Sequence, residues 1–413
     1  MDGPTLTLLL VQIGLVLAIP LLMAKLLERL ALSPLVVELL CGVMLGPSVF
    51  GMIDPGLFAR VFPAMGRATQ AREAVTELGL LLFVFMAGLE LQPKRLGSLG
   101  ATIVWSSFLG ILAPLALGVG SVLVWPGFWR NQAQNNVPLL ALFVGTILSI
   151  SALPVIARIL MDLNLMQTEL GAIVMSSAML NDLAGWGLFA VILSNFGGEG
   201  HSGRNWWASL VTVLLVFGLI LNLSNQRIQR AVGWLNLPKE TLQLKLTFLV
   251  LTTAAIFSQV AGTHATLGAF LAGVALGRIP DARRLAHESF YRATAGILST
   301  MYFVSIGLKA NFVTNFDLAL VAFVLVLACA GKLGGVFLGA RLGGKNPRDA
   351  LVVALGMNAR GAMGIVLTSV ALEYGLIGQR IFVALVVMAL ATSVFSAVGI
   401  KHLLGPITGG RPA

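Results

Sequence analysis

Long apolar segments constrain the fold of this chain more than any other feature of its sequence. Apolar residues fall in runs of about 18 to 28, and an α-helix needs roughly 20 such residues to cross the hydrocarbon core of a bilayer. Hydrophobic residues make up 57% of the chain and charged residues 11%, whereas soluble domains have about 45–50% and about 25%. The sequence therefore predicts an all-α polytopic membrane protein and excludes an ordinary soluble fold.

The apolar runs predict about thirteen transmembrane helices. The first seven are expected near residues 5–27, 34–50, 75–91, 99–124, 138–160, 168–194 and 206–224. The other six are expected near residues 243–261, 264–277, 293–308, 316–342, 349–371 and 379–403. Because the last helix ends close to the end of the chain, we expect one membrane domain over residues 1–413 and no C-terminal regulatory domain.

The distribution of Lys and Arg between alternate sides of these helices predicts their orientation. Short cytoplasmic loops are enriched in basic residues. Eighteen of the 27 Lys and Arg fall on one side and seven on the other, while Lys332 and Arg360 fall inside predicted spans. We therefore expect a plasma (bacterial inner) membrane protein with its N-terminus outside and its C-terminus in the cytoplasm.

Two predicted helices carry residues that interrupt a helix. The helix at 138–160 contains Pro154, and a proline inside a helix removes one backbone donor and clashes with the carbonyl four residues earlier. The helix at 349–371 contains Asn358 and Arg360 between two glycines. The two helices cross the membrane in opposite directions, as an inverted repeat requires, and broken helices in corresponding positions indicate a transporter's binding site. The alternative for Pro154 is a simple kink in a packed helix.

Asp182 is the clearest candidate for a functional residue. It lies beside Asn181 at the midpoint of the helix at 168–194, where an ionisable group costs several kcal/mol or more. Such a group persists if it is neutral, paired or bound to a cation. Lys332, near the middle of the helix at 316–342, is its expected partner. Burial favours a neutral carboxyl and the lysine favours an ionised one, so the balance suits exchange of a proton for a cation. A static ion pair is the alternative role for Lys332.

Arg360 and a glycine series are assigned structural roles. We expect Arg360 to neutralise carbonyl ends of the broken helices or to pair with an acidic group. Gly331, Gly335, Gly339 and Gly343 are spaced by four and predict a bare helix face for close backbone contact with a neighbouring helix.

Several other functions are excluded by the same sequence. The segment 339–345 fits the start of a phosphate-binding loop, but Asn346 replaces the required Ser or Thr and no strand precedes it. Neither an HExxH motif nor a cluster of metal ligands is present. A passive channel would need a continuous polar pore or rings of carboxylates, and the sequence shows neither. Scattered basic residues do not form a nucleic-acid module. The sequence therefore predicts a transporter, not an enzyme, without a cofactor and without a nucleic-acid partner.

Several segments together resemble the monovalent cation:proton antiporters of the Kef and plant CHX branch. The longest is SISALPVIARILMDLNLMQTELGAIVMSSAMLNDLAGW at 149–186. The others are 38–51, ELGLLLFVFMAGLEL at 77–91, GTHATLGAFLAG at 262–273, YFVSIGLKAN at 302–311, GKLGG at 331–335 and NARG at 358–361. The resemblance covers nearly the whole chain.

The resemblance implies an NhaA-like fold with an inverted repeat and two crossed discontinuous helices. A dimerisation domain would stay fixed while core helices, about 99–194 and 316–403, carry the ion by an elevator-type movement. Asp182 matches the family's ion-binding carboxylate and Lys332 the lysine that interacts with it. The matching positions around the crossing are Ser149, Ser151, Pro154 and Asn181. Lys309 matches the lysine of the GLK motif, and a homodimer is also implied.

The sequence departs from this family at three points. Val37 replaces the glycine usual before Glu38, Ser151 stands where threonine is common, and we expect no Kef C-terminal domain. Because Asn181 precedes Asp182, there is one obvious carboxylate, which favours electroneutral exchange. We therefore predict a secondary antiporter that exchanges K⁺ or Na⁺ for protons at Asp182 and serves pH homeostasis. The alternative is a proton- or sodium-coupled carrier of a small organic solute on the same fold.

Overall fold

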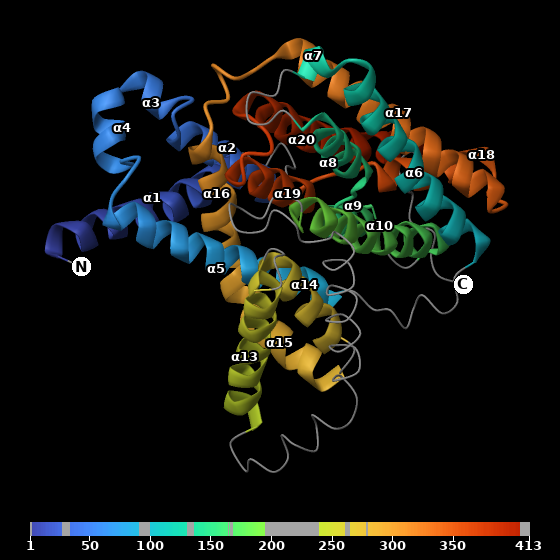
Figure 1. The fold of residues 1–413 in the computed structure, drawn as a ribbon. Helices are drawn as coiled ribbons and strands as arrows, with labels where there is room; N and C mark the ends of the chain where they lie inside the picture. Colours follow the sequence, from blue (N-terminus) through green and yellow to red (C-terminus); the bar gives the residue numbers. More distant parts are fainter. Residues whose placement is uncertain are drawn as a thin grey trace. The chain divides into compact units, whose positions relative to one another are not determined.

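The structure is a computed structural model in which the chain is helical over most of its described length (Figure 1). It describes residues 2–26, 34–90, 100–129, 136–163, 165, 168–194, 239–260, 265–277 and 280–404. Within these residues, six helices are long and apolar enough to cross a membrane. These are Gly3–Leu26, Val36–Ile53, Ala101–Val124, Glu169–Phe189, Leu318–Leu342 and Gln379–Leu403. The chain is therefore a multi-pass membrane protein, and the predicted helix at 206–224 lies outside the described residues.

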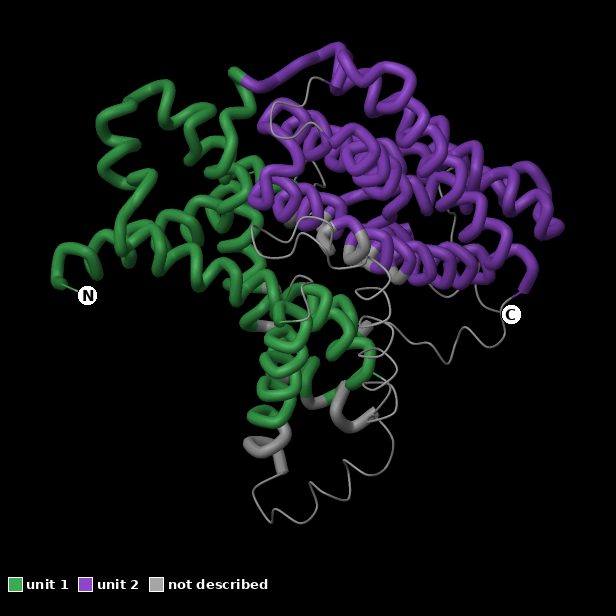
Figure 2. The backbone as a smooth tube through the Cα atoms, viewed as in Figure 1, with its two compact units in different colours: residues 1–94, 193–314 green, residues 95–192, 315–413 purple. Residues whose placement is uncertain are grey.

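The chain divides into two compact units, each built from two segments of sequence (Figure 2). Unit 1 contains residues 1–94 and 193–314, and unit 2 contains residues 95–192 and 315–413. Each unit therefore joins two sets of helices that are separated in the sequence.

Unit 1 is held together by close pairing of its helices. Its described helices are α1 (Gly3–Leu26), α2 (Pro34–Leu45), α3 (Phe50–Ile53), α4 (Pro55–Val61), α5 (Arg67–Glu90), α13 (Lys239–Val260), α14 (Ala265–Leu276), α15 (Pro280–Ala293) and α16 (Ser299–Lys309). A Cβ at Gly273 of α14 would lie 3.0 Å from the Cα of Gly88 in α5. Leu82, Phe85 and Met86 of α5 pack nearby with Ala269 and Ala272. Glycine thus lets these helices approach backbone to backbone while larger side chains fill the core around them.

Three predicted helices in unit 1 differ from the structure at a boundary. The helix predicted at 75–91 begins earlier, at Arg67, as α5. The predicted helix at 34–50 ends as α2 at Leu45, because Gly46 and Pro47 follow and proline disfavours a helical residue before it. The helix predicted at 293–308 begins instead at Pro280 and passes through a π-helical turn, Thr294–Leu298, into α16. Its first part is polar, so an apolar run could not reveal it.

Unit 2 is organised around the pairing of two long apolar helices. Its described helices are α6 (Ala101–Val124), α7 (Pro126–Trp129), α8 (Val137–Ser149), α9 (Leu153–Asp162), α10 (Glu169–Ser194), α17 (Leu318–Leu342), α18 (Pro347–Met357), α19 (Ala362–Glu373) and α20 (Gln379–Leu404). The glycine series of α17 faces α6. A Cβ at Gly331 would lie 2.7 Å from the Cα of Pro114, and a Cβ at Gly335 would lie 2.9 Å from the Cβ of Ala113. The predicted bare face is thus present, and α6 is its partner.

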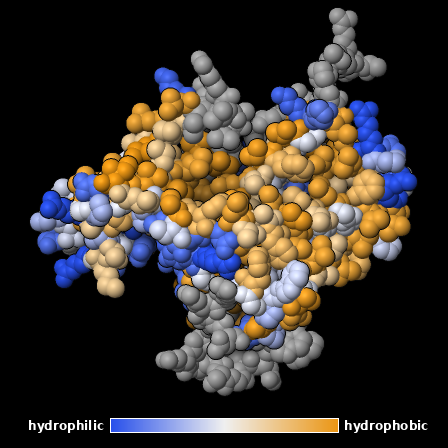
Figure 3. Space-filling model, turned by 90° about the horizontal axis from the view of Figure 1, so that it is seen from above, coloured by the Kyte–Doolittle hydropathy of each residue, from blue (hydrophilic) through white to orange (hydrophobic). Residues whose placement is uncertain are grey.

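Large apolar side chains remain exposed on helices of both units. Leu21 of α1 is 75% exposed, Val124 of α6 is 72% and Leu318 of α17 is 70%. Figure 3 shows hydrophobic side chains, in orange, spread over much of the face seen in that view. Soluble monomers rarely expose large apolar patches, so these side chains are suited to contact with lipid acyl chains.

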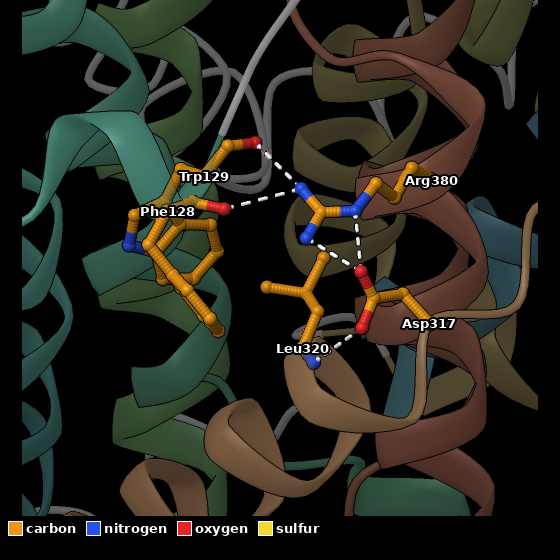
Figure 4. Close-up of polar contacts among 5 residues, drawn as sticks. All are labelled: Phe128, Trp129, Asp317, Leu320 and Arg380. Carbon is orange, nitrogen blue, oxygen red and sulfur yellow. Dashed lines mark hydrogen bonds and ion pairs between the residues drawn. The ribbon is translucent and has the colours of Figure 1, made fainter.

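An ion pair at the ends of two apolar spans ties three segments of unit 2 together (Figure 4). Arg380, in the first turn of α20, donates to Oδ2 of Asp317 from Nε at 2.8 Å and from Nη2 at 2.6 Å. Asp317 also caps α17, because its Oδ1 accepts from the N–H of Leu320 at 3.0 Å. Nη1 of Arg380 donates to the carbonyl oxygens of Phe128, at 3.1 Å, and Trp129, at 3.4 Å. The N–H of Leu320 and the Arg380 guanidinium hold the pKa of the Asp317 carboxyl below its usual value.

We predict that Asp317→Asn lowers the free energy of unfolding at neutral pH. It should also make this free energy depend less on pH in the acid range. Since the folded pKa of Asp317 is depressed, its contribution is complete above the unfolded value of about 3.9 and is lost as pH falls below it. Thermal unfolding of the purified chain at neutral pH and at about pH 3 measures this. Arg380→Gln should act in the same direction. A variant with the full acid response of the wild type would contradict the prediction.

We predict that Gly335→Val destabilises unit 2 by about 1–3 kcal/mol, as overpacking usually does. The added side chain would meet Leu109 O and Ala113 on α6. The control is Gly334→Val on the same helix, because a Cβ at Gly334 meets nothing within 4 Å. Thermal unfolding in detergent should separate the two variants. Equal unfolding temperatures would show that the glycine face does not control the pairing.

Candidate functional site

The first helix break separates α8 from α9. Helix α8 ends at Ser149, residues 150–152 leave the helix in extended conformation, and α9 begins at Leu153. Pro154 occupies the first turn of α9, where a proline leaves no additional donor unsatisfied. Pro154 therefore begins a new helix and does not kink a continuous one, so the predicted helix at 138–160 is two helices.

The second break separates α18 from α19 and lies against the first. Helix α18 ends at Met357, and α19 begins at Ala362. The N–H of Ala152 donates to the carbonyl oxygen of Ala359 at 3.0 Å. The hydroxyl of Ser151 donates to the carbonyl oxygen of Met357 at 2.8 Å. These two bonds join the non-helical residues of the first break to the end of α18 and to the second break, inside unit 2.

Asp182 lies on α10 with its carboxyl group at the start of α9. The residue is 3% exposed, and its carboxylate accepts a hydrogen bond from the backbone N–H of Leu153. The N-terminus of a helix carries a partial positive charge, which favours an anion there. Oδ1 of Asp182 has no hydrogen-bond partner among the described residues. The carboxylate therefore presents one buried oxygen that a proton or a cation could bind.

Lys332 lies close enough to Asp182 for the two charges to interact, but it also binds two backbone carbonyls. Its side chain is fully buried, and Nζ donates to the carbonyl oxygen of Gly110 in α6 at 3.0 Å. Nζ also donates to the carbonyl oxygen of Ser149, the last residue of α8. The carbonyls at a helix C-terminus lack intrahelical partners and carry partial negative charge, so Lys332 caps α8 as well as facing the carboxylate.

Arg360 caps the same end of α8 from the second break. Nη2 donates to the carbonyl oxygen of Leu148 at 2.6 Å and to that of Ala328 in α17 at 3.0 Å. Nη1 donates to Oδ1 of Asn358 at 3.1 Å. Two cations thus hold the adjacent carbonyls of Leu148 and Ser149. Arg360 is thus placed where it could neutralise carbonyl ends of α8, and the role predicted for it stays a prediction.

The serine hydroxyls at the first break donate their protons to carbonyl oxygens. Ser149 Oγ donates to Gly145 O at 2.7 Å and Ile111 O at 3.0 Å. A hydroxyl that donates its single proton keeps two lone pairs as acceptors. Asn181, on α10, is 1% exposed, and its Nδ2 would lie 3.8 Å from a Cβ at Gly110. The hydroxyls of Ser149 and Ser151 therefore keep the capacity to accept at the first break.

Unit 2 contains almost all of the predicted site residues. They are Ser149, Ser151, Pro154, Asn181, Asp182, Lys332, Asn358 and Arg360. Lys309 lies in the last turn of α16 and belongs to unit 1. Sequence reasoning missed the carbonyls of Gly110 and Ile111 on α6. It also missed Ser393 of α20, whose hydroxyl donates to the carbonyl oxygen of Arg360. The glycine series of α17 predicted that a neighbouring helix packs against it. This was the sequence signal that could have led to α6.

The family described as sodium/hydrogen exchanger, transmembrane, matches residues 15–405. The chain belongs to this family. It is a family of transporters, not of enzymes. The exchanger chain is 31% identical to cation/H(+) antiporter 18 of Arabidopsis thaliana over 405 residues, which are 95% of this chain and 49% of that protein. It is 29% identical to the Na(+)/H(+) antiporter NhaS4 of Synechocystis, covering 96% of this chain and 97% of that protein. The chain thus spans about half the length of the Arabidopsis relative and nearly all of NhaS4.

The exchanger chain also shares its fold with a solved antiporter structure. The sodium proton antiporter MjNhaP1 of Methanocaldococcus jannaschii, solved at pH 8, matches with a TM-score of 0.64. The match covers 96% of each chain at 19% sequence identity. At this sequence identity the likeness shows the fold alone. The matched residues include both units of this chain.

We predict that Ser151→Ala weakens the contact between the two breaks, because it removes the bond to Met357. The expected loss of stability is about 1 kcal/mol. Ser151→Thr keeps a hydroxyl and should retain most of the stability. Unfolding temperatures of the purified variants measure the effect. An alanine variant as stable as the wild type would refute the assigned role.

Proposed function

We propose that this exchanger chain is a secondary active antiporter that exchanges a monovalent cation, K⁺ or Na⁺, for protons by alternating access. The observation that carries the proposal is the buried carboxylate of Asp182, which keeps one oxygen without a partner among the described residues. Family membership and the cation/proton antiporter names of its relatives support the same reaction.

Competition for one carboxylate provides the coupling. Ionised Asp182 binds the cation together with oxygens of Ser149, Ser151 and Asn181. A proton that binds Asp182 neutralises it and displaces the cation. With neither ligand, Asp182 holds a buried negative charge that Lys332 offsets only in part, because its ammonium also binds two backbone carbonyls. This charge resists movement through a low-dielectric barrier. Only the loaded forms then cross, so cation and proton move in opposite directions.

Lys332 and Arg360 bind the end of α8 in the same way in the empty and in the loaded site. Their hydrogen bonds to Ser149 O and Leu148 O keep the C-terminal end of α8 neutral whichever ligand Asp182 holds. Lys332 also offsets the charge of ionised Asp182 before the cation arrives. With a single carboxylate in this pair of residues, we infer electroneutral exchange of one cation for one proton.

The architecture proposed for this cycle is NhaA-like. Residues of unit 2 would form the ion-carrying core, and unit 1 would form the scaffold and the contact of a homodimer. The two discontinuous helices would cross as corresponding parts of an inverted repeat, among thirteen transmembrane helices. The positions of basic residues support an N-terminus outside and a C-terminus in the cytoplasm of the plasma, or bacterial inner, membrane.

We predict that Asp182→Asn abolishes cation-driven proton movement while the protein remains folded. Proteoliposomes with a lumenal pH dye are challenged in turn with K⁺, Na⁺, Li⁺ and choline. Wild type should dissipate the pH gradient with K⁺ or Na⁺ and ignore choline.

The control for this experiment is Asp349→Asn, which changes a partly exposed carboxylate in the first turn of α18. It should exchange like the wild type. Normal transport by Asp182→Asn would overturn the proposed site. If no inorganic cation acts on the wild type, a carrier of a small organic solute becomes the better interpretation.

A further inference from the structure

A second carboxyl lies near the start of an apolar span, in the unit that does not contain Asp182. Glu38 belongs to α2, inside the apolar span Val36–Ile53, and its side chain is only partly exposed. An ionised carboxylate inside a bilayer costs several kcal/mol or more unless it is paired, neutral or bound. The exchange mechanism does not use this group, so its presence needs another explanation.

The contact that Glu38 makes is a hydrogen bond to an uncharged hydroxyl. Thr300 Oγ1, in α16, donates to Glu38 Oε1 at 2.7 Å, and Thr300 is 7% exposed. A hydroxyl both donates and accepts. The same geometry can therefore hold an ionised carboxylate, by donation to it, and a neutral carboxylic acid.

The helices around this pair are packed too closely to rearrange freely. A Cβ at Gly46, the residue after α2, would lie 2.6 Å from the carbonyl oxygen of Gly307 in α16, and a Cβ at Gly42 of α2 would meet Val304 O. Cys41, one turn after Glu38, is fully buried. The Glu38 carboxyl therefore stays beside Thr300. It can gain or lose a proton without a movement of the helices.

The described helices that pack against α2 carry three titratable side chains, Lys25 of α1 and Tyr302 and Lys309 of α16. Those helices are α16, α1 and α3. Lys309 of α16 lies about 13 Å along the helix axis from Thr300, and Tyr302 lies about 200° around the helix from it. Lys25, in the last turn of α1, is exposed. Helix α3, Phe50–Ile53, has no titratable side chain, and Cys41 is the titratable neighbour on α2 itself.

We propose that Glu38 is a second proton-binding site of the protein, held by Thr300 and separate from the exchange site at Asp182. The Glu38 carboxyl releases one proton to water as pH rises and takes one back as pH falls, and no other bond changes. Deprotonation places a negative charge between α2 and α16, so this site adds a pH response to unit 1. The inference goes beyond the exchange reaction and does not depend on it.

Infrared difference spectroscopy of the full chain in lipid bilayers, between acidic and alkaline pH, tests this assignment. The background is Asp182→Asn, which removes the carboxyl of the exchange site. We expect a carbonyl stretch from a protonated carboxylic acid that disappears as pH rises and is absent when Glu38→Gln is added. Glu73→Gln is the matched control, because it removes an exposed carboxyl of α5 and should leave the band in place.

Thr300 variants identify the carboxyl independently. Thr300→Val has nearly the same shape but no hydroxyl, so the band should move to higher frequency, while Thr300→Ser should leave it unchanged. The proposal is overturned if Glu38→Gln leaves the spectra unchanged, if the Glu38 band persists at strongly alkaline pH, or if Thr300→Val causes no shift. The last comparison decides the matter even if Glu38→Gln fails to fold. Normal transport by Asp182→Asn would remove the proposed exchange site and leave this result intact.

Discussion

The end of helix α8 is the constraint on which the rest of unit 2 depends. A helix that stops inside a membrane leaves carbonyls without water or intrahelical partners, and each unsatisfied group costs several kcal/mol. Lys332 and Arg360 satisfy the carbonyls of Ser149 and Leu148. Two cations at membrane depth would themselves be prohibitive, and the partial negative charge of the helix end and the carboxylate of Asp182 compensate them. The two cations, the end of α8 and the Asp182 carboxylate thus lower the free-energy cost of one another's burial.

Close helix packing makes that solution geometrically possible. Lys332 belongs to α17, and the glycine series on the same helix brings its backbone against α6. The approach lets one ammonium group reach both Gly110 O on α6 and Ser149 O on α8. At the end of α17 outside the apolar span, Asp317 and Arg380 fix the helix to α20 and to the residues after α6. Packing by small residues and ion pairs at the helix ends therefore together set the register of the site.

The sequence predicted a large part of the candidate site because its members are conspicuous in an apolar background. Asp182, Lys332 and Arg360 are ionisable groups in segments where charge is costly, and Pro154 marks a helix that cannot continue. The carbonyls of Gly110 and Ile111 could not be found in this way, because every residue has a carbonyl and only three-dimensional proximity selects one. Ser393 was missed for a similar reason, since serine is common in membrane helices and its contact with Arg360 lies outside local sequence. The role of Lys309 stays a prediction.

By itself the sequence determined the all-helical membrane fold, most helix positions and the two interruptions, because hydrophobic length and backbone chemistry act locally along the chain. It did not determine that Pro154 begins a helix, that the 280–309 region is helical throughout, or that α6 is the partner of the glycine face. Only the tertiary structure decided which carbonyls the buried cations bind and that Glu38 meets Thr300. These contacts join residues far apart in the chain, and their energies depend on distances and burial that exist only after the helices have packed.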